Sequence, residues 1–171
     1  MRKIHKRMKL SFHKTFPDNL ELIGGLPTNF KLKIWRSMFY DVKMNLKEMC
    51  LKFSKLSEQE KDLVDVVNPK IHTFRKDPEN VWFAGKTIEA VCEGEYFLPA
   101  IKVTRTQKVK IETYQWEGKT TGVITIDGKI IKKSLHDFIA LNDGFDSADA
   151  FFNYFHEGFT GKLIHWTDLK Y

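Results

Sequence analysis

The sequence of 171 residues predicts an α+β domain built around a small mixed or closed sheet. The first observation behind this prediction is a change of period. Apolar residues recur at helical spacing between Thr28 and Val67, whereas from Trp82 onward they alternate as in β-strands. The second observation is that the strand-like segments, about six of them, are joined by short helices and turns. We therefore expect one domain, residues 1–171, that carries an inserted helical block at residues 19–68.

The N-terminal part contains one predicted strand and two predicted helices. Leu10 and Phe12 alternate as in a strand, and a long helix should begin at Thr28 or Asn29, either of which can cap it. Its apolar stripe is Trp35, Phe39, Val42, Leu46, Met49 and Phe53. If this stripe is buried, Leu46→Ala should cost about 2–5 kcal/mol. Ser57 with Glu60 predicts a capping box for the second helix.

The remaining chain predicts strands separated by short helices. Predicted strands are residues 70–75, 87–92, 100–104, 109–113 and 163–167. Asp127-Gly128 between two alternating segments predicts a hairpin. Ser134 should cap a short helix that Gly144 ends, and Asp146 or Ser147 should cap another that Gly158 ends.

Composition excludes several classes of protein. Cys50 and Cys92 are the only cysteines, which is too few for a disulfide framework or a paired-cysteine zinc site. There is no apolar run of membrane-spanning length and no secretory signal pattern, so we expect a cytoplasmic protein without a membrane partner. The net charge of +6 is compatible with a phosphate-bearing partner, although many solvated surfaces share it. Metal-binding and cofactor motifs are absent from the sequence, and no cofactor is expected.

Chemistry is concentrated in the segment Lys70-Ile71-His72-Thr73-Phe74-Arg75. Neighbouring cations can lower the pKa of the Thr73 hydroxyl, and a buried Lys70 can lose its proton and act as a base. Asp143 could orient that lysine or relay a proton. In a regular strand, however, Lys70 and Thr73 point to opposite faces, so the arrangement requires a bend near Pro69. The alternative is an ordinary strand face, with Asp143 as a turn former before Gly144.

The order of three motifs resembles the ASCH domain, which belongs to the PUA-like β-barrel group. The motifs are residues 70–75, Gly85-Lys86 leading into a strand, and Asn142-Asp143-Gly144-Phe145-Asp146 before an aromatic helix. The resemblance covers residues 67–171, and residues 10–16 are similar to the first strand of the family. The chain is also similar to uncharacterised phage and gut-bacterial proteins. The resemblance implies a PUA-like small mixed β-barrel with short helices and an inserted helical block near the N-terminus.

The resemblance also implies two functions. PUA-like domains commonly bind RNA or a single base turned into a cleft of the barrel. Small ASCH amidohydrolases deacylate cytidine that is acylated on its exocyclic amine, and they use a lysine, a threonine and a glutamate. These catalytic positions fall on Lys70, Thr73 and Asp143. The third is Asp instead of Glu, which shortens the side chain by one methylene, and a displacement on that scale can remove much of a catalytic rate.

We expect a binding module for RNA or a nucleotide-like ligand. The alternative is an amidohydrolase that acts on a modified nucleoside, and a third hypothesis is a protein-interaction or structural role. In the binding module, Arg75 would hold phosphate and Trp82 would stack a base. Lys108 and Lys110 would line a groove that leads to the cleft.

Overall fold

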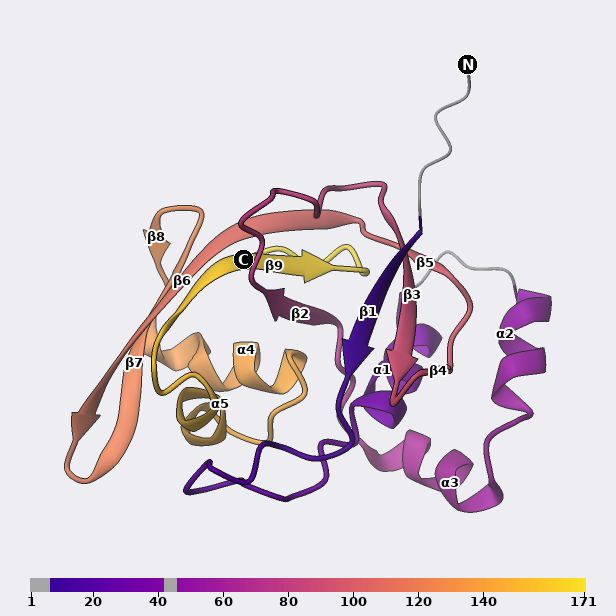
Figure 1. Cartoon of the computed structure of the whole chain (residues 1–171), viewed down its shortest axis with the longest axis horizontal. Helices are drawn as coiled ribbons and strands as arrows, with labels where there is room; N and C mark the ends of the chain where they lie inside the picture. The colour runs from indigo at the N-terminus through magenta and orange to yellow at the C-terminus, as the bar shows by residue number, and fades with distance from the viewer. Residues whose placement is uncertain (1–6, 42–45) are drawn as a thin grey trace.

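The computed structural model describes residues 7–41 and 46–171, without the side chains of residues 40, 41, 46 and 48. The described chain forms two β-sheets and five α-helices, which confirms the predicted α+β class. Figure 1 shows the two sheets side by side, each with its own group of helices. Within the described ranges, no helix is long and apolar enough to cross a membrane.

The smaller sheet is organised around β3, Thr87–Cys92. β1 (Met8–Phe12) runs parallel to β3, whereas β4 (Glu95–Tyr96) and β5 (Ile101–Lys102) pair with it in the antiparallel sense. The helices α1 (Phe30–Asp41), α2 (Leu46–Phe53) and α3 (Glu58–Val66) lie on this side of the molecule (Figure 1).

The larger sheet is antiparallel, with the strand order β2-β9-β6-β7-β8. Its strands are β2 (His72–Arg75), β6 (Arg105–Trp116), β7 (Lys119–Ile126), β8 (Lys129–Ile130) and β9 (Phe159–His165). A short 3-10 turn (Lys133–Leu135) leads into α4 (His136–Asn142), and α5 (Ala148–Tyr154) follows. Both helices lie below this sheet in Figure 1.

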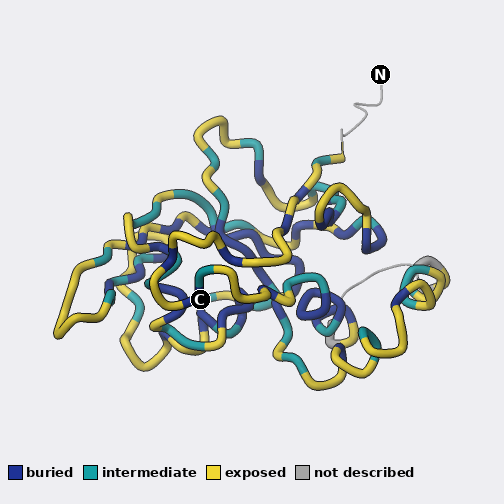
Figure 2. The backbone as a smooth tube through the Cα atoms, turned by 60° about the horizontal axis from the view of Figure 1, so that its bottom comes forward, coloured by how far each residue is buried: buried dark blue, intermediate teal, exposed yellow. Residues whose placement is uncertain are grey.

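Two hydrophobic clusters form the core. One joins the smaller sheet to α1 and includes Leu10, Trp35 and Ile88. The other joins the larger sheet to α4 and α5 and includes Ile139 and Phe151. Figure 2 shows the buried segments gathered in the middle of the molecule. The candidate site described below draws its side chains from elements of both groups.

The helical block differs in part from the prediction of one long helix. The described chain contains α1 and α2, and Val42 lies outside the described residues, as does the side chain of Leu46. Trp35 is fully buried, but Phe39 is 49% exposed, so the predicted stripe is only partly a core face. The capping box of Ser57 and Glu60 at the start of α3 is confirmed.

Candidate functional site

A bend before β2 places the side chains of the 70–75 segment. The backbone N–H of Lys70 donates to the carbonyl of Lys33 at 2.9 Å, and that of Ile71 donates to the carbonyl of Asn142 at 2.9 Å. These two residues are therefore held by α1 and by the end of α4, and β2 begins only at His72. Because Lys70 lies outside the strand, the two-residue strand period does not separate its side chain from that of Thr73.

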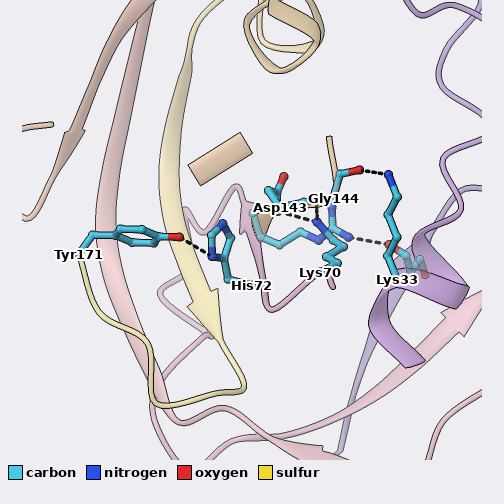
Figure 3. A network of polar contacts seen from close by, with 8 residues as sticks. Lys33, Lys70, His72, Asp143, Gly144 and Tyr171 are labelled. Atoms are coloured by element: carbon cyan, nitrogen blue, oxygen red, sulfur yellow. Dashed lines mark hydrogen bonds and ion pairs between the residues drawn. The ribbon is translucent and has the colours of Figure 1, made fainter. Parts of the chain in front are cut away.

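Lys70 and Asp143 form a buried ion pair. Lys70 Nζ lies 2.6 Å from Asp143 Oδ1, and it also donates to the backbone carbonyl of Asp143. The two side chains are 0% and 6% exposed. The Lys70 ammonium also lies 4.6 Å from the centre of the Phe30 ring, a cation–π contact. Figure 3 shows the lysine reaching the end of α4.

Burial acts on both members of this pair. It lowers the pKa of the Lys70 ammonium to about 8, against the raising effect of Asp143. It raises the pKa of the Asp143 carboxyl to about 6, against the lowering effects of Lys70, of Arg75 and of the Phe74 backbone N–H. Each group therefore exchanges its proton nearer neutral pH than it would in water, and either group can take part in a proton transfer.

A second buried cation, Lys33, holds the same turn from the side of α1. Its Nζ donates to the carbonyl of Gly144 at 2.7 Å (Figure 3) and to Asp146 Oδ1 at 2.9 Å. Lys33 is 6% exposed. The sequence analysis did not find this residue, because Lys33 lies on the opposite side of the helix from the predicted apolar stripe. Only its tertiary contacts with the 144–146 turn reveal it.

Lys70, Thr73, Arg75 and Asp143 line one cavity of about 380 Å³, which we call the central cavity. Its other walls include the aromatic side chains Phe12, Phe30, Phe145, Tyr154, Phe155 and Phe159. The Thr73 hydroxyl makes no hydrogen bond to any residue that the structure describes. The cavity therefore combines a buried ion pair, a free hydroxyl and aromatic walls.

Arg75 links the two sheets at the rim of the central cavity. Its Nη2 donates to the carbonyl of Ser11 in β1 at 2.7 Å, and its guanidinium lies 5.2 Å from the centre of the Phe12 ring. Burial lowers the pKa of this guanidinium, and the nearby Asp143 carboxylate opposes that effect. Arg75 still carries a positive charge at neutral pH.

Three residues expected to bind ligand do not line the central cavity. Trp82 is 5% exposed and packs in the core cluster of the smaller sheet. Lys108 and Lys110 lie on the face of β6 opposite to Val109 and Ile111, which point into the core. Their proposed contacts with ligand remain predictions, and they would have to occur away from this cavity.

A buried polar cluster lies behind the site, on residues that flank its motifs. His72 Nδ1 lies 3.3 Å from the Tyr171 hydroxyl, which accepts a hydrogen bond from Asn142 Nδ2 at 2.9 Å. His165 Nε2 lies 3.1 Å from Gln107 Oε1. Burial lowers the pKa of His72 well below its ordinary value and that of His165 to about 4, so both imidazoles are neutral at pH 7. The cluster anchors the start of β2 and the end of α4.

Comparisons with known proteins do not identify the chain: no family model, curated protein or solved structure matches it. In the part of the chain that the structure describes, no group of three or more His, Cys, Asp or Glu side chains could hold a metal ion. The functional argument therefore depends on the geometry of the central cavity.

Proposed function

We propose that the central cavity binds a small nucleotide-like ligand. The observation that carries the proposal is the convergence of Lys70, Thr73 and Asp143, from two distant motifs, on one aromatic-walled cavity. Its volume of about 380 Å³ lies within the range of small-molecule sites. A planar base can pack against rings such as Phe30 and Tyr154, because stacking on aromatic side chains tolerates any base.

The polar groups specify how such a ligand would be oriented. The Thr73 hydroxyl can donate to or accept from the edge of a base, and the Asp143 carboxylate can accept from an exocyclic amine. Arg75 and Lys76, which also lines the cavity, provide positive charge for a phosphate. With Lys70 neutralised by Asp143, the remaining charge favours an anionic ligand.

The ASCH resemblance and the PUA-like barrel belong to this proposal. Support comes from residues 70–75 and 142–146, which are separate motifs in the sequence but meet at the Lys70–Asp143 pair. The structure has two sheets, and the central cavity is lined by residues from a strand of each. This arrangement is compatible with such a barrel.

A second candidate function is hydrolysis of an acylated cytidine. It is favoured by an unpartnered Thr73 hydroxyl in the same cavity as Lys70, whose pKa is lowered toward neutrality. In this reaction water would add to the acyl carbon, the C–N bond would break, and the departing amine would receive a proton. Lys70 in its neutral form could accept the proton of the water and later return it to the amine.

The test is a calorimetric titration of cytidine, cytidine monophosphate and acylated cytidine into the full chain. We expect saturable binding, tighter for the monophosphate than for the nucleoside, and weaker binding by Thr73→Val. If none of the three ligands binds at a concentration of about 1 mM, where even weak binding is detected, the proposal is overturned. Release of cytidine from the acylated ligand, abolished by Lys70→Ala in a folded variant, would establish hydrolysis. Equal background rates would leave only the binding function.

A strand of RNA as the natural ligand would add a dependence on salt. Log affinity should then fall with log salt by about 0.7 for each phosphate contact. Lys108→Glu combined with Lys110→Glu should flatten this slope if the strand runs over β6. Unchanged binding curves would restrict the ligand to the central cavity.

A further inference from the structure

The Tyr171 phenol bridges the two segments that form the candidate site. Its oxygen accepts a hydrogen bond from Asn142 Nδ2 at 2.9 Å and lies 3.3 Å from His72 Nδ1. Figure 3 shows the phenol reaching His72. Each of these partners is followed in the chain by a residue that lines the central cavity: Asp143 comes after Asn142, and Thr73 comes after His72.

Gln107 holds the backbone of Tyr171 in place. Its Nε2 donates to the carbonyl of Tyr171 at 3.1 Å, and its Oε1 accepts from the N–H of Tyr171 at 3.3 Å. The same Nε2 donates to Asp127 Oδ2 at 2.9 Å. The centre of the Tyr171 ring lies 5.5 Å from that of His72 and 6.2 Å from that of Phe138. A buried side-chain amide thus pairs with the Tyr171 backbone as a neighbouring strand would, which fixes the direction of the phenol.

The chemistry of the partners determines which atoms carry hydrogens. Asn142 Nδ2 can only donate, so the phenol oxygen accepts there, and its one hydrogen is left for His72 Nδ1. Burial raises the pKa of the Tyr171 phenol, so this hydrogen is retained at neutral pH. Neutral His72 is therefore a bare acceptor at Nδ1 and carries its proton on Nε2. Removing the hydroxyl would take a hydrogen-bond partner from two buried groups at once.

One path from the phenol to the site runs through Asn142. The carbonyl of Asn142 accepts the hydrogen bond from the Ile71 N–H at 2.9 Å, so Asn142 also holds the bend before β2. The next residue is Asp143, whose carboxylate lies 2.6 Å from Lys70 Nζ. A displacement of Asn142 would therefore shift both the bend and the buried ion pair.

The other path runs through His72. This residue opens β2 and is the strand partner of His165 in β9. Thr73 follows it directly and lines the central cavity. His72 and Asn142 are 0% and 8% exposed, so bulk water cannot replace the phenol at either of them without local opening.

We propose that Tyr171 is a positioning residue of the central cavity. Its hydroxyl fixes Asn142 and His72. Through them it sets the placement of the two neighbouring residues that line the cavity, Asp143 and Thr73. This effect on geometry does not depend on a ligand, whereas the effect on affinity rests on the proposed function. A residue that only stabilises the fold would act on the whole core, but a positioning residue acts most on the two site segments.

The test compares Tyr171→Phe with Tyr114→Phe, which removes the same hydroxyl from a ring on β6 that is 52% exposed. Amide hydrogen exchange of the full chain is followed by NMR. In Tyr171→Phe, exchange at Ile71 should become about tenfold faster or more, because two hydrogen bonds that support its partner are lost. The change should be smaller at Ile111, in the core of the larger sheet. Tyr114→Phe should leave both rates unchanged.

Two further measurements examine the hydrogen bonds and the affinity. The ring ¹⁵N resonances of His72 should show a bare Nδ1 in the wild type, and this resonance should move downfield in Tyr171→Phe as the nitrogen loses its donor. Cytidine monophosphate should bind Tyr171→Phe about fivefold more weakly or worse, and Tyr114→Phe as it binds the wild type. Asn142→Ala should cause a similar loss, and its combination with Tyr171→Phe should cost little more, since both remove one interaction.

Failure of this proposal can be distinguished from failure of the proposed function. If cytidine monophosphate does not bind the wild type, the proposed function fails, and exchange at Ile71 decides the positioning role. Exchange that rises no more at Ile71 than at Ile111 would overturn the proposal, because Tyr171 would then only stabilise the fold. A protonated Nδ1 on His72 in the wild type would overturn it as well, since the order of donors would be reversed. Equal affinities of the wild type and Tyr171→Phe for cytidine monophosphate would have the same consequence.

Discussion

Replacing Lys70 with methionine tests whether the ion pair at the centre of the site is as buried as the structure indicates. The side chains of Lys70 and Asp143 are 0% and 6% exposed, and their charged atoms lie 2.6 Å apart. Lys70→Met removes one charge and leaves the Asp143 carboxylate buried without its cation. Breaking a buried pair in this way costs about 3–5 kcal/mol of unfolding free energy.

The same perturbation has a predictable dependence on pH. Lys70 lowers the pKa of Asp143, so its removal should raise that pKa further above about 6. A carboxyl whose folded pKa is raised binds protons more readily in the folded state, and the protein therefore loses stability as pH rises through that pKa. The difference in unfolding free energy between Lys70→Met and wild type should thus grow as pH increases above about 6.

Urea denaturation at several pH values measures this effect, with two comparisons. Lys70→Met combined with Asp143→Asn removes both charges and should recover most of the loss. Lys110 lies 2.6 Å from Glu112 in a pair whose side chains are 54% and 56% exposed, so Lys110→Met should cost at most about 1 kcal/mol. A loss of under about 1 kcal/mol for Lys70→Met at pH 7, equal to that of Lys110→Met, would refute the reasoning.

Three further predictions concern packing and protonation. Leu32→Ala in α1 should cost about 2–5 kcal/mol, whereas the exposed Leu51→Ala in α2 should change stability by about 0.5 kcal/mol or less, as measured by denaturant titration. Equal losses would mean that α1 is not packed on the smaller sheet. Burial lowers the pKa of His165 to about 4, so the unfolded chain binds more protons than the folded one between about pH 4 and pH 6.5. Stability should therefore fall as the pH is lowered through that range. His165→Gln should reduce this fall, and an unchanged slope in acid titrations would contradict burial of a neutral imidazole. Gly161→Ala places a Cβ 2.3 Å from the carbonyl oxygen of Arg75, so thermal unfolding should occur at a lower temperature, and an unchanged melting temperature would argue against the close approach of β2 and β9.

The sequence predicted the elements whose signals are local. The change from helical to strand period gave the α+β class, and the capping box of Ser57 and Glu60 forms as expected. β6 is longer than predicted, extending over Arg105–Trp116, because it pairs with β7 on one side and with β9 on the other. Pairing with two neighbouring strands depends on the tertiary structure, so the local alternation of apolar and polar residues does not predict the full length of β6.

The candidate site could be predicted only in part. The motifs identified Lys70, Thr73 and Asp143, but the bend that lets the first two share a cavity depends on hydrogen bonds from Lys70 to Lys33 and from Ile71 to Asn142. These partners are distant in the sequence and have no local signature. Trp82 was expected to be a stacking surface for a base, whereas the structure places it in the core cluster of the smaller sheet.

Titration of cytidine monophosphate into wild type and Thr73→Val tests the central claim most directly. Thr73 lines the central cavity without a hydrogen-bond partner among the described residues, so its hydroxyl is available to a ligand. The matched control is Thr125→Val in β7, a threonine that does not line the central cavity. We predict saturable binding to the wild type and to Thr125→Val, and about tenfold or greater loss of affinity for a folded Thr73→Val. Equal dissociation constants for all three proteins would contradict the assignment of the cavity as the ligand site.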